Sequence, residues 1–240
     1  MTIALLDGDI FAYRTAATAE QEEFWIAKSR VNEMLERCLS AVKAESYQLW
    51  LSGDPAENFR YQIYPEYKAN RTQPKPRHLE PLREFLVKTW AARLTPEAEC
   101  DDYLGINAAE DTIICSIDKD LLQIPGNHWN FVKEEHTFVS KEDGYRRFYK
   151  HLLIGDASDN IRGVSGIGRV KAERLIQDTF TEREAFDATR NAFNNDEAFA
   201  LTGNLIYVLR NEGEKWSEMK RDWFANIERE GEGQIPGEVA

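Results

Sequence analysis

Residues 112–120, Thr-Ile-Ile-Cys-Ser-Ile-Asp-Lys-Asp, place two aspartates directly after a short apolar run. The same arrangement occurs near the N-terminus, where the apolar residues 3–6 are followed by Asp7-Gly8-Asp9. A third apolar run, residues 47–51, leads into the turn sequence Ser52-Gly53-Asp54-Pro55. Short apolar runs bounded by turn residues are typical of buried strands. We therefore predict three strands, each followed by at least one carboxylate.

Helical patterns separate these strands. Apolar residues recur at helical spacing over residues 20–43, residues 81–92 are expected to be helical, and another helix is predicted to start near residue 97. A weaker strand is predicted over residues 129–132. Strands that alternate with helices favour an α/β fold with a mostly parallel central sheet flanked by helices. Ligands bind beyond the carboxyl ends of such strands, which is where Asp7, Asp54, Asp118 and Asp120 fall.

Carboxylates gathered at one sheet edge repel one another and raise one another's pKa values unless a cation lies between them. The run Glu99-Cys100-Asp101-Asp102 adds three acids at the start of a predicted helix, where negative charge suits the helix dipole. Hard oxygen ligands without histidine or thiolate favour Mg²⁺ or Mn²⁺ over zinc. A divalent metal site built from several segments is therefore predicted, and a nuclease is the first function to test.

The composition is that of a globular protein. With 240 residues, 42% of them hydrophobic and 11% aromatic, the chain can bury the core of one large domain or of a domain with a smaller appendage. Three widely spaced cysteines (Cys38, Cys100 and Cys115) provide neither a disulfide framework nor zinc spacing, which favours a reducing cytoplasm. The N-terminal apolar run lacks the features of a signal peptide, and no apolar stretch approaches the roughly 18 residues of a membrane span. We expect a cytoplasmic protein that does not bind membranes.

The net charge of −12 matters less than its distribution. Removing the nine acids that are candidate metal ligands changes −12 to −3. These nine are Asp7, Asp54, Glu99, Asp101, Asp102, Asp118, Asp120, Asp156 and Asp159. Residues 60–93 hold eight Lys or Arg against three acids, a local net charge of +5. The acidity of the chain therefore does not exclude DNA or RNA as a substrate.

After about residue 141 the pattern becomes helical and includes a glycine-rich stretch at residues 155–168. Glycines 163, 166 and 168 permit a tight hairpin and close backbone approach to a ligand. The helix predicted over residues 169–179 offers free N–H groups to a phosphate, and Arg169 and Lys171 add positive charge. We divide the chain into a core at residues 1–140, a helical part at 141–225 and a disordered tail at 226–240.

Six of these pieces, in this order, resemble the 5′-nuclease (flap endonuclease) superfamily, above all the phage and bacterial 5′–3′ exonucleases and the N-terminal nuclease domain of bacterial DNA polymerase I. They are Leu6-Asp7-Gly8-Asp9, Ser52-Gly53-Asp54, Tyr67-Lys68-Ala69-Asn70-Arg71, Glu99-Cys100-Asp101-Asp102, Ser116-Ile117-Asp118-Lys119-Asp120, and the segment from Gly155 to Gly168. The resemblance covers residues 3–180, about three-quarters of the chain. Two positions depart from the family pattern: Cys100 stands where an alanine is usual, and the hairpin is Gly-Val-Ser-Gly-Ile-Gly. The resemblance implies a PIN-like core followed by a helical helix–hairpin–helix (H3TH) subdomain.

The resemblance also implies two bound Mg²⁺ or Mn²⁺ ions. The first would be held by Asp7, Asp54, Glu99 and Asp101. The second would be held by Asp101, Asp118, Asp120 and Asp156, with Asp102 and Asp159 as outer or water-mediated ligands. Two such ions, about 4 Å apart, activate water and stabilise the leaving oxygen in phosphodiester hydrolysis.

The basic segment is similar to the arch of the family, beneath which a single-stranded 5′ end passes; here it covers residues 60–83. Lys68 and Arg71 would neutralise the scissile phosphate, and Tyr67 would stack on a terminal base. Further DNA contacts are expected from Arg60, Lys75 and Arg77. The hairpin formed by Gly163, Gly166 and Gly168 resembles a clamp that grips duplex phosphates and often binds K⁺.

The implied function is a metal-dependent 5′–3′ exonuclease and flap endonuclease that acts on DNA as a monomer, with replication or recombination proteins as further partners. Two alternatives stay open. A PIN-type ribonuclease shares the acidic sheet but usually lacks the arch and the hairpin clamp. A non-catalytic, structure-specific DNA-binding protein would require the loss of ligand acids, and every acid position that the family uses is filled here.

Overall fold

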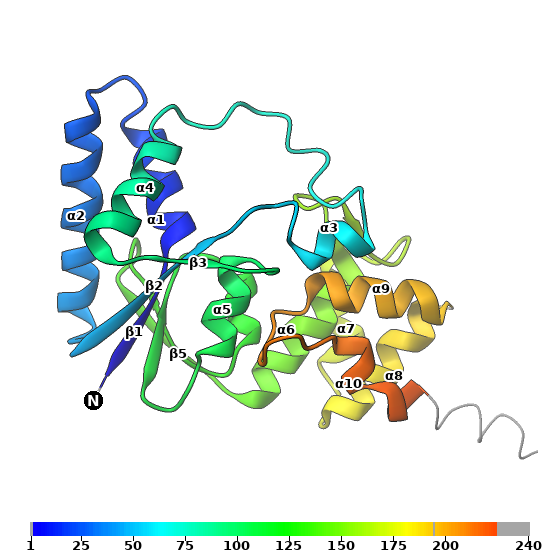
Figure 1. The fold of residues 1–240 in the computed structure, drawn as a ribbon. Helices are drawn as coiled ribbons and strands as arrows, with labels where there is room; N and C mark the ends of the chain where they lie inside the picture. The colour runs from blue at the N-terminus through cyan, green and yellow to red at the C-terminus, as the bar shows by residue number, and fades with distance from the viewer. Residues whose placement is uncertain (1, 194, 225–240) are drawn as a thin grey trace, which may run out of the picture.

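A computed structural model describes residues 2–193 and 195–224 (Figure 1). At its centre is a six-stranded sheet in the order β3-β2-β1-β4-β5-β6. The strands are β1 (Ile3–Asp7), β2 (Ser46–Ser52), β3 (Arg93–Thr95), β4 (Thr112–Cys115), β5 (Gly126–Asn130) and β6 (Glu135–Val139). All neighbours pair in parallel except β5 and β6, which are antiparallel. The predicted mostly parallel sheet is confirmed.

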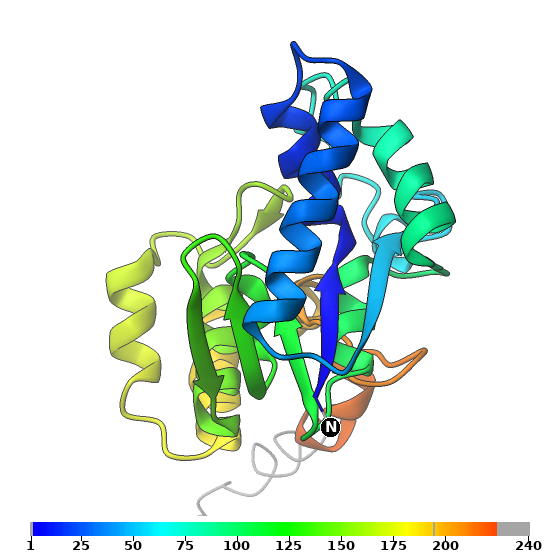
Figure 2. The same ribbon diagram turned by 90° about the vertical axis from the view of Figure 1, so that its left-hand side faces the viewer.

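Helices cover both faces of this sheet, as Figures 1 and 2 show. Helices α1 (Gly8–Thr18), α2 (Phe24–Ala41) and α4 (Leu79–Trp90) pack on one face, and α5 (Cys100–Ile106) packs on the other. In β1, Ala4 and Leu6 pack in the hydrophobic cluster on the face covered by α1, α2 and α4. Leu5 packs in the cluster on the face covered by α5. Side chains alternate along a strand, so a strand buried on both faces needs an apolar residue at every position. This explains the uninterrupted apolar run at residues 3–6.

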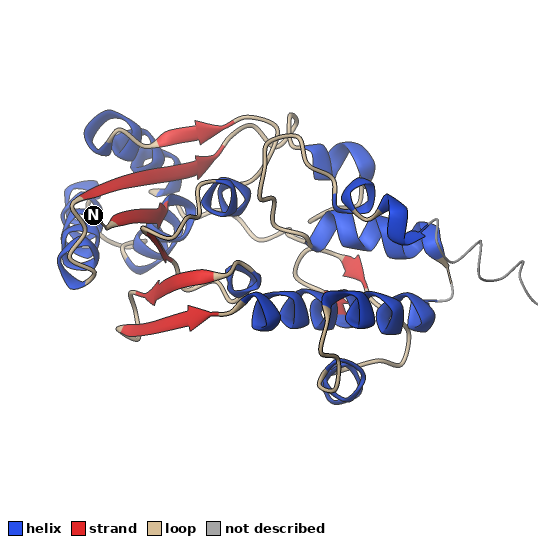
Figure 3. Ribbon diagram, turned by 90° about the horizontal axis from the view of Figure 1, so that it is seen from below, coloured by secondary structure: helices blue, strands red, loops and turns tan. Residues whose placement is uncertain are grey.

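The second half of the chain forms a helical part beside the sheet (Figure 3). It contains α6 (Lys141–Ile154), the two-stranded hairpin of β7 (Gly155–Asp156) and β8 (Ile161–Arg162), α7 (Arg169–Ile176), α8 (Glu182–Phe193), α9 (Asp196–Ile206) and α10 (Trp216–Met219). Its core is aromatic, with Phe148, Phe186, Phe199 and Trp216 in one cluster. The disordered tail expected at residues 226–240 lies outside the described residues.

The segment between α3 (Phe59–Ile63) and α4, residues 64–78, crosses from the helical part to the sheet (Figure 1). We call residues 64–78 the arch segment. Its two ends are fixed in different places, because Tyr67 packs in the aromatic cluster of the helical part and Leu79 in the cluster that covers the sheet. Among the described residues, no helix has the length and apolar character needed to cross a membrane.

Several element predictions need correction. Asp7-Gly8-Asp9, expected as turn residues that bound the first strand, forms no separate turn, since α1 begins at Gly8 and the Asp7 side chain caps it. The helix predicted from residue 20 begins at Phe24, and its Trp25, expected in the core, is 65% exposed. Strands β3 and β6 were not predicted. Each has only one buried residue, so neither has the apolar run by which a buried strand is recognised.

A candidate metal centre at the carboxyl edge of the sheet

Asp7 ends β1, at the point where β1 pairs with β2 on one side and β4 on the other. This is where the connections from a parallel sheet diverge, and it is the usual ligand-binding position. The Asp7 carboxylate is 1% exposed and accepts hydrogen bonds from the Ile10 amide at 3.1 Å and the Ser116 hydroxyl at 2.6 Å. Burial, reinforced by the charges of Asp9 and Asp118, raises the pKa of Asp7 to about 7.

Asp101 lies beside Asp7, in the first turn of α5. Asp7, Cys100 and Asp101 offer ligand atoms that all lie within 4.8 Å of one another. Burial, together with Asp7 and Asp118, raises the pKa of Asp101 well above its ordinary value. Burial also raises the pKa of the Cys100 thiol, and its sulfur donates to the Trp50 carbonyl at 3.2 Å. A divalent cation between these buried carboxylates would relieve their mutual repulsion, because it supplies the missing counter-charge.

Glu99 has its counter-charge within the protein. Its carboxylate accepts hydrogen bonds from the Tyr67 hydroxyl at 2.8 Å and from the Lys68 ammonium. Burial favours the neutral acid, but the charges of Lys68 and Arg60 outweigh it and hold the pKa of Glu99 below its usual value. Lys68 also lies 3.6 Å from Asp159. Lys68 therefore supplies positive charge at a position where the family resemblance implies a metal ion.

A second group of ligand atoms joins the segment after β4 to the hairpin. Atoms of Asp120, His151 and Asp156 all lie within 4.8 Å of one another. Burial raises the pKa of Asp120 to about 6. The neighbouring His151 ring, with help from Ser158, holds the pKa of Asp156 well below its usual range. The two groups thus differ in charge balance, because only the second contains a basic side chain.

Both groups contribute to one small cavity of about 40 Å³. Its acidic lining comes from α5, from the 3₁₀ turn η1 (Asp120–Gln123) and from the hairpin, and consists of Glu99, Asp101, Asp120, Asp156 and Asp159. A buried water needs only about 10–15 Å³, so the cavity has room for an ion. Asp118 lies next to it and accepts a hydrogen bond from the Asp120 amide at 2.8 Å. The donor set and the cavity together fit divalent metal ions.

Two predicted metal ligands lie elsewhere. Asp54 is exposed in the turn after β2, where its side chain accepts a hydrogen bond from the Ala56 amide at 2.9 Å, and it belongs to neither group. Asp102 is fully buried and accepts hydrogen bonds from Arg60 at 2.5 and 2.9 Å and from the amides of Glu99 and Leu209, each at 3.0 Å. These hydrogen bonds give Asp102 a structural role, and its place as an outer or water-mediated ligand stays a prediction.

Two predicted DNA contacts are also buried. Arg60 is 4% exposed and donates to Asp102 and to the carbonyls of Leu205 and Tyr207. Tyr67 is 2% exposed, and its hydroxyl donates to Glu99 and, at 3.1 Å, to Asp159. Neither side chain can reach a base or a phosphate in this structure. Tyr67 instead positions two acids of the cavity.

Beyond Lys68, the predicted cations of the arch segment are exposed. Arg71 donates to Asp159 at the edge of the cavity. Lys75 forms an ion pair with Glu80 at 3.1 Å, and Arg77 donates to the backbone carbonyl of Glu22. The local excess of positive charge is therefore largely engaged within the protein.

The glycines of the hairpin have two different roles. A Cβ on Gly163 would lie 2.3 Å from the Ile154 carbonyl carbon, so Gly163 allows the close packing of the hairpin itself. Gly166, at φ +75°, and Gly168 have open space where a side chain would be. Lys171 donates to the Gly166 carbonyl at 2.8 Å, and Arg169 begins α7. Gly166 and Gly168 therefore leave open space beside the start of α7.

A groove of about 890 Å³ leads away from the carboxylates. It runs from Asp118, Asp120 and Asp156 to Arg169, and α6 lines it with Arg147, Lys150 and His151. None of these three α6 residues was predicted. Their spacing of three and four residues on the helix that leads into the hairpin would have indicated a common face.

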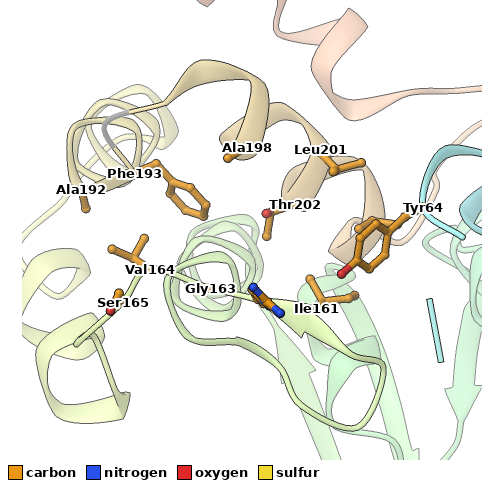
Figure 4. Close-up of a pocket in the computed structure, with 12 residues that line it drawn as sticks. Tyr64, Ile161, Gly163, Val164, Ser165, Ala192, Phe193, Ala198, Leu201 and Thr202 are labelled. Carbon is orange, nitrogen blue, oxygen red and sulfur yellow. The ribbon is translucent and has the colours of Figure 1, made fainter. Parts of the chain in front are cut away.

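A second cavity, of about 540 Å³, lies between the hairpin and α9 (Figure 4). Its lining is mostly apolar and includes Tyr64, Val164, Phe193 and Leu201. Among the described residues that line it there is no carboxylate, so this cavity is not part of the metal centre.

Comparisons with known proteins identify the family of the chain. The family described as "5′-3′ exonuclease, N-terminal resolvase-like domain" matches residues 2–150, and the chain belongs to this family. It is 30% identical over 244 residues to the 5′-3′ exonuclease of Mycoplasma genitalium, covering 88% of this chain and 80% of that protein. It is 33% identical over 160 residues to the 5′-3′ exonuclease of Buchnera aphidicola, of which the match covers 54%, and 29% identical to the thermostable DNA polymerase I of Thermus thermophilus, of which it covers 24%. The chain thus spans about half the length of the Buchnera relative and about a quarter of that polymerase.

Solved structures share the fold. The bacteriophage T5 5′-exonuclease with bound zinc has a TM-score of 0.70 at 17% identity, over 86% of this chain and 89% of that one. The T5 flap endonuclease in a complex with DNA and metal ions has a TM-score of 0.69 at 16% identity, over 96% and 97% of the two chains.

Proposed function

We propose that this protein is a divalent-metal-dependent 5′–3′ exonuclease and flap endonuclease that hydrolyses phosphodiester bonds near the 5′ ends of DNA. The observation that carries the proposal is the cavity lined by five acids from three separate segments, in a chain of the 5′-3′ exonuclease family. The related T5 enzymes bind divalent metal ions, and one of them was solved with DNA.

Two Mg²⁺ or Mn²⁺ ions fit the donor set. Asp7, Glu99 and Asp101 would hold the first, and Asp118, Asp120 and Asp156 the second, with Asp159 as an outer ligand. Bound there, such ions supply an activated water and stabilise the leaving oxygen of the phosphodiester.

The basic residues around the cavity would orient the DNA. The Lys68 ammonium lies beside the carboxylates of Glu99 and Asp159, so it can neutralise a phosphate that approaches these acids. Arg71 can assist from the rim, where its side chain is 55% exposed. The cations of the groove, Arg147, Lys150 and Arg169, would follow the phosphates of the duplex.

The hairpin supports a further contact. The space beside Gly166 and Gly168 is open, and α7 begins directly after these glycines, so this segment would bind duplex phosphates and K⁺ as an H3TH clamp. We propose that the protein acts as a monomer and that replication or recombination proteins are its partners.

The test uses a 5′-labelled flap DNA, a blunt duplex and a single-stranded RNA, each with Mg²⁺ and with EDTA. We expect metal-dependent cutting of DNA near the 5′ end and none by Asp101→Asn. The matched control is Asp111→Asn, which removes an exposed aspartate that precedes β4 at the opposite edge of the sheet. Cutting of RNA alone would favour the PIN-type ribonuclease. DNA binding without cutting in either metal would favour the non-catalytic alternative.

A further inference from the structure

We infer that His151 is a nitrogen ligand of the second metal ion, and that this site therefore favours a transition-metal ion such as Mn²⁺ over Mg²⁺. The inference rests on the proposed function, because it assigns one more residue to the same metal centre.

The position of the imidazole ring carries the inference. His151 lies on α6 with its side chain 21% exposed, between acids from two other segments. Its Nδ1 is 3.5 Å from Asp120 Oδ1, and its Nε2 is 3.6 Å from Asp156 Oδ2. Among the described residues, no polar contact of this ring is shorter.

Only one ring nitrogen can bind a given ion, and one nitrogen of His151 lies within 4.8 Å of carboxylate oxygens of both Asp120 and Asp156, close enough for the three groups to share an ion. A good N–H···O hydrogen bond joins atoms about 2.7–3.2 Å apart. Ligands that surround one ion at about 2.1 Å from it lie roughly 3–4 Å from one another. The three ligand atoms of Asp120, His151 and Asp156 all lie within 4.8 Å of one another, so small side-chain movements would complete a common coordination sphere.

The donor set then determines the metal preference. Mg²⁺ binds almost only oxygen and keeps several waters. Imidazole nitrogen adds affinity for transition-metal ions. Two carboxylates and one imidazole are thus a mixed set, whereas the acids around Asp101 are an all-oxygen set. The two halves of the centre would differ in the ion that each prefers.

One other role for His151 would produce the same geometry. A protonated ring could act only as a counter-charge that keeps Asp120 and Asp156 together without metal. In that case a metal ion would have to displace it, and removal of the ring would strengthen metal binding. A ligand must instead lose its proton, and its removal weakens binding.

The experiment is pulsed EPR on the untagged protein loaded with Mn²⁺ at both sites, without DNA. We expect a nitrogen hyperfine coupling in the wild type that is absent in His151→Gln. His136→Gln is the matched control, because His136 is exposed on β6 and bonded to the Asn127 side chain. The nitrogen coupling measured in His136→Gln should equal that of the wild type. Titration calorimetry should show Mn²⁺ binding at one site weakened about 10–100-fold in His151→Gln, with a much smaller change for Mg²⁺.

No nitrogen coupling in the fully loaded wild type would overturn the inference, as would coupling that persists in His151→Gln. Stronger Mn²⁺ binding by His151→Gln would assign the counter-charge role instead and would also overturn it. His151→Asn replaces the glutamine variant if thermal unfolding shows that the latter is not folded. The EPR readout needs no cleavage, so the two proposals can fail separately. Cleavage of flap DNA without nitrogen coupling would contradict only this inference. Nitrogen coupling without cleavage of DNA would contradict only the proposed function.

Discussion

The guanidinium of Arg60 and the carboxylate of Asp102 form a buried ion pair with contacts of 2.5 and 2.9 Å, and both side chains are at most 4% exposed. The pair joins the start of α3 to α5, and Arg60 also holds the end of α9 through the carbonyls of Leu205 and Tyr207. It therefore ties the helical part to the sheet.

We expect Arg60→Met or Asp102→Asn alone to lower the free energy of unfolding by about 3–5 kcal/mol, because each leaves a buried charge or polar group without its partner. The double variant Arg60→Met/Asp102→Leu should lose less than either single change. Urea unfolding measures this, with Lys88→Met in the exposed Lys88–Glu84 pair as a control that changes by less than about 1 kcal/mol. A stable Arg60→Met variant with weakened DNA binding would restore the prediction of a DNA contact.

Two variants of Tyr67 distinguish the role of its ring in stability from the role of its hydroxyl in the metal centre. Its ring is buried in the aromatic cluster, edge-on to Tyr61 at 5.2 Å between centroids, so Tyr67→Ala should lower stability by about 3–5 kcal/mol. Tyr67→Phe keeps the ring but removes the bonds to Glu99 and Asp159, and should slow cleavage while leaving the fold intact. Urea unfolding and flap cleavage are the two readouts. If Tyr67→Ala were as stable as the wild type and bound DNA weakly, the ring would be stacking on a base.

The pH dependence of the metal-free protein should reflect Asp7. Its pKa is about 7 in the folded protein against an ordinary value of 3.8, so between these values the folded state binds more protons than the unfolded state. The free energy of unfolding should therefore fall as the pH rises from about 4 to about 7 in EDTA. Asp120, with a pKa of about 6, should add to the fall over the lower part of this range.

Asp7→Asn should remove part of this slope, and Mg²⁺ should reduce it because the ion replaces the missing counter-charge. Asp111→Asn is the control that should keep the slope. Chemical unfolding at several pH values measures the effect, and an unchanged slope in Asp7→Asn would show that the Asp7 pKa is not raised.

Lys68→Ala should affect catalysis more than binding. Loss of one group that stabilises developing charge slows the chemical step by about 10²–10³-fold, whereas one phosphate contact among several changes the DNA dissociation constant much less. The Lys68 ammonium also competes with a metal ion for the Glu99 carboxylate, so Mg²⁺ should bind more tightly to Lys68→Ala. Single-turnover cleavage and calorimetry measure the two effects, with Lys133→Ala in the exposed β5–β6 turn as control. A variant that bound DNA weakly but cleaved at the normal rate would make Lys68 a docking residue only.

The acids at the strand ends could be predicted because a parallel sheet fixes their neighbours. Once the apolar runs at residues 3–6 and 112–117 are adjacent strands, Asp7 and Asp118 must lie at the same edge, whatever the rest of the chain does. Asp54 is an exception, because the turn after β2 leaves its side chain exposed and bonded to the Ala56 amide.

The cations could not be assigned in the same way. A sequence shows that Arg60 and Lys75 are both positive, but only the folded chain places Asp102 beside one and solvent around the other. His151 was missed because its partner Asp120 comes from a separate segment, so no local spacing connects these two residues. Burial and long-range pairing are tertiary properties that local pattern does not determine.

The cavity of the metal centre is lined by α5, η1 and the hairpin, segments that meet only when the helical part has docked against the sheet. An ion held there binds the native state and none of the partly folded states in which that docking is incomplete. If docking follows the rate-limiting step of folding, the ion slows unfolding and leaves the folding rate unchanged. The lifetime of the folded molecule, and with it the resistance of the hairpin to proteolysis, would then rise with the free concentration of the ion.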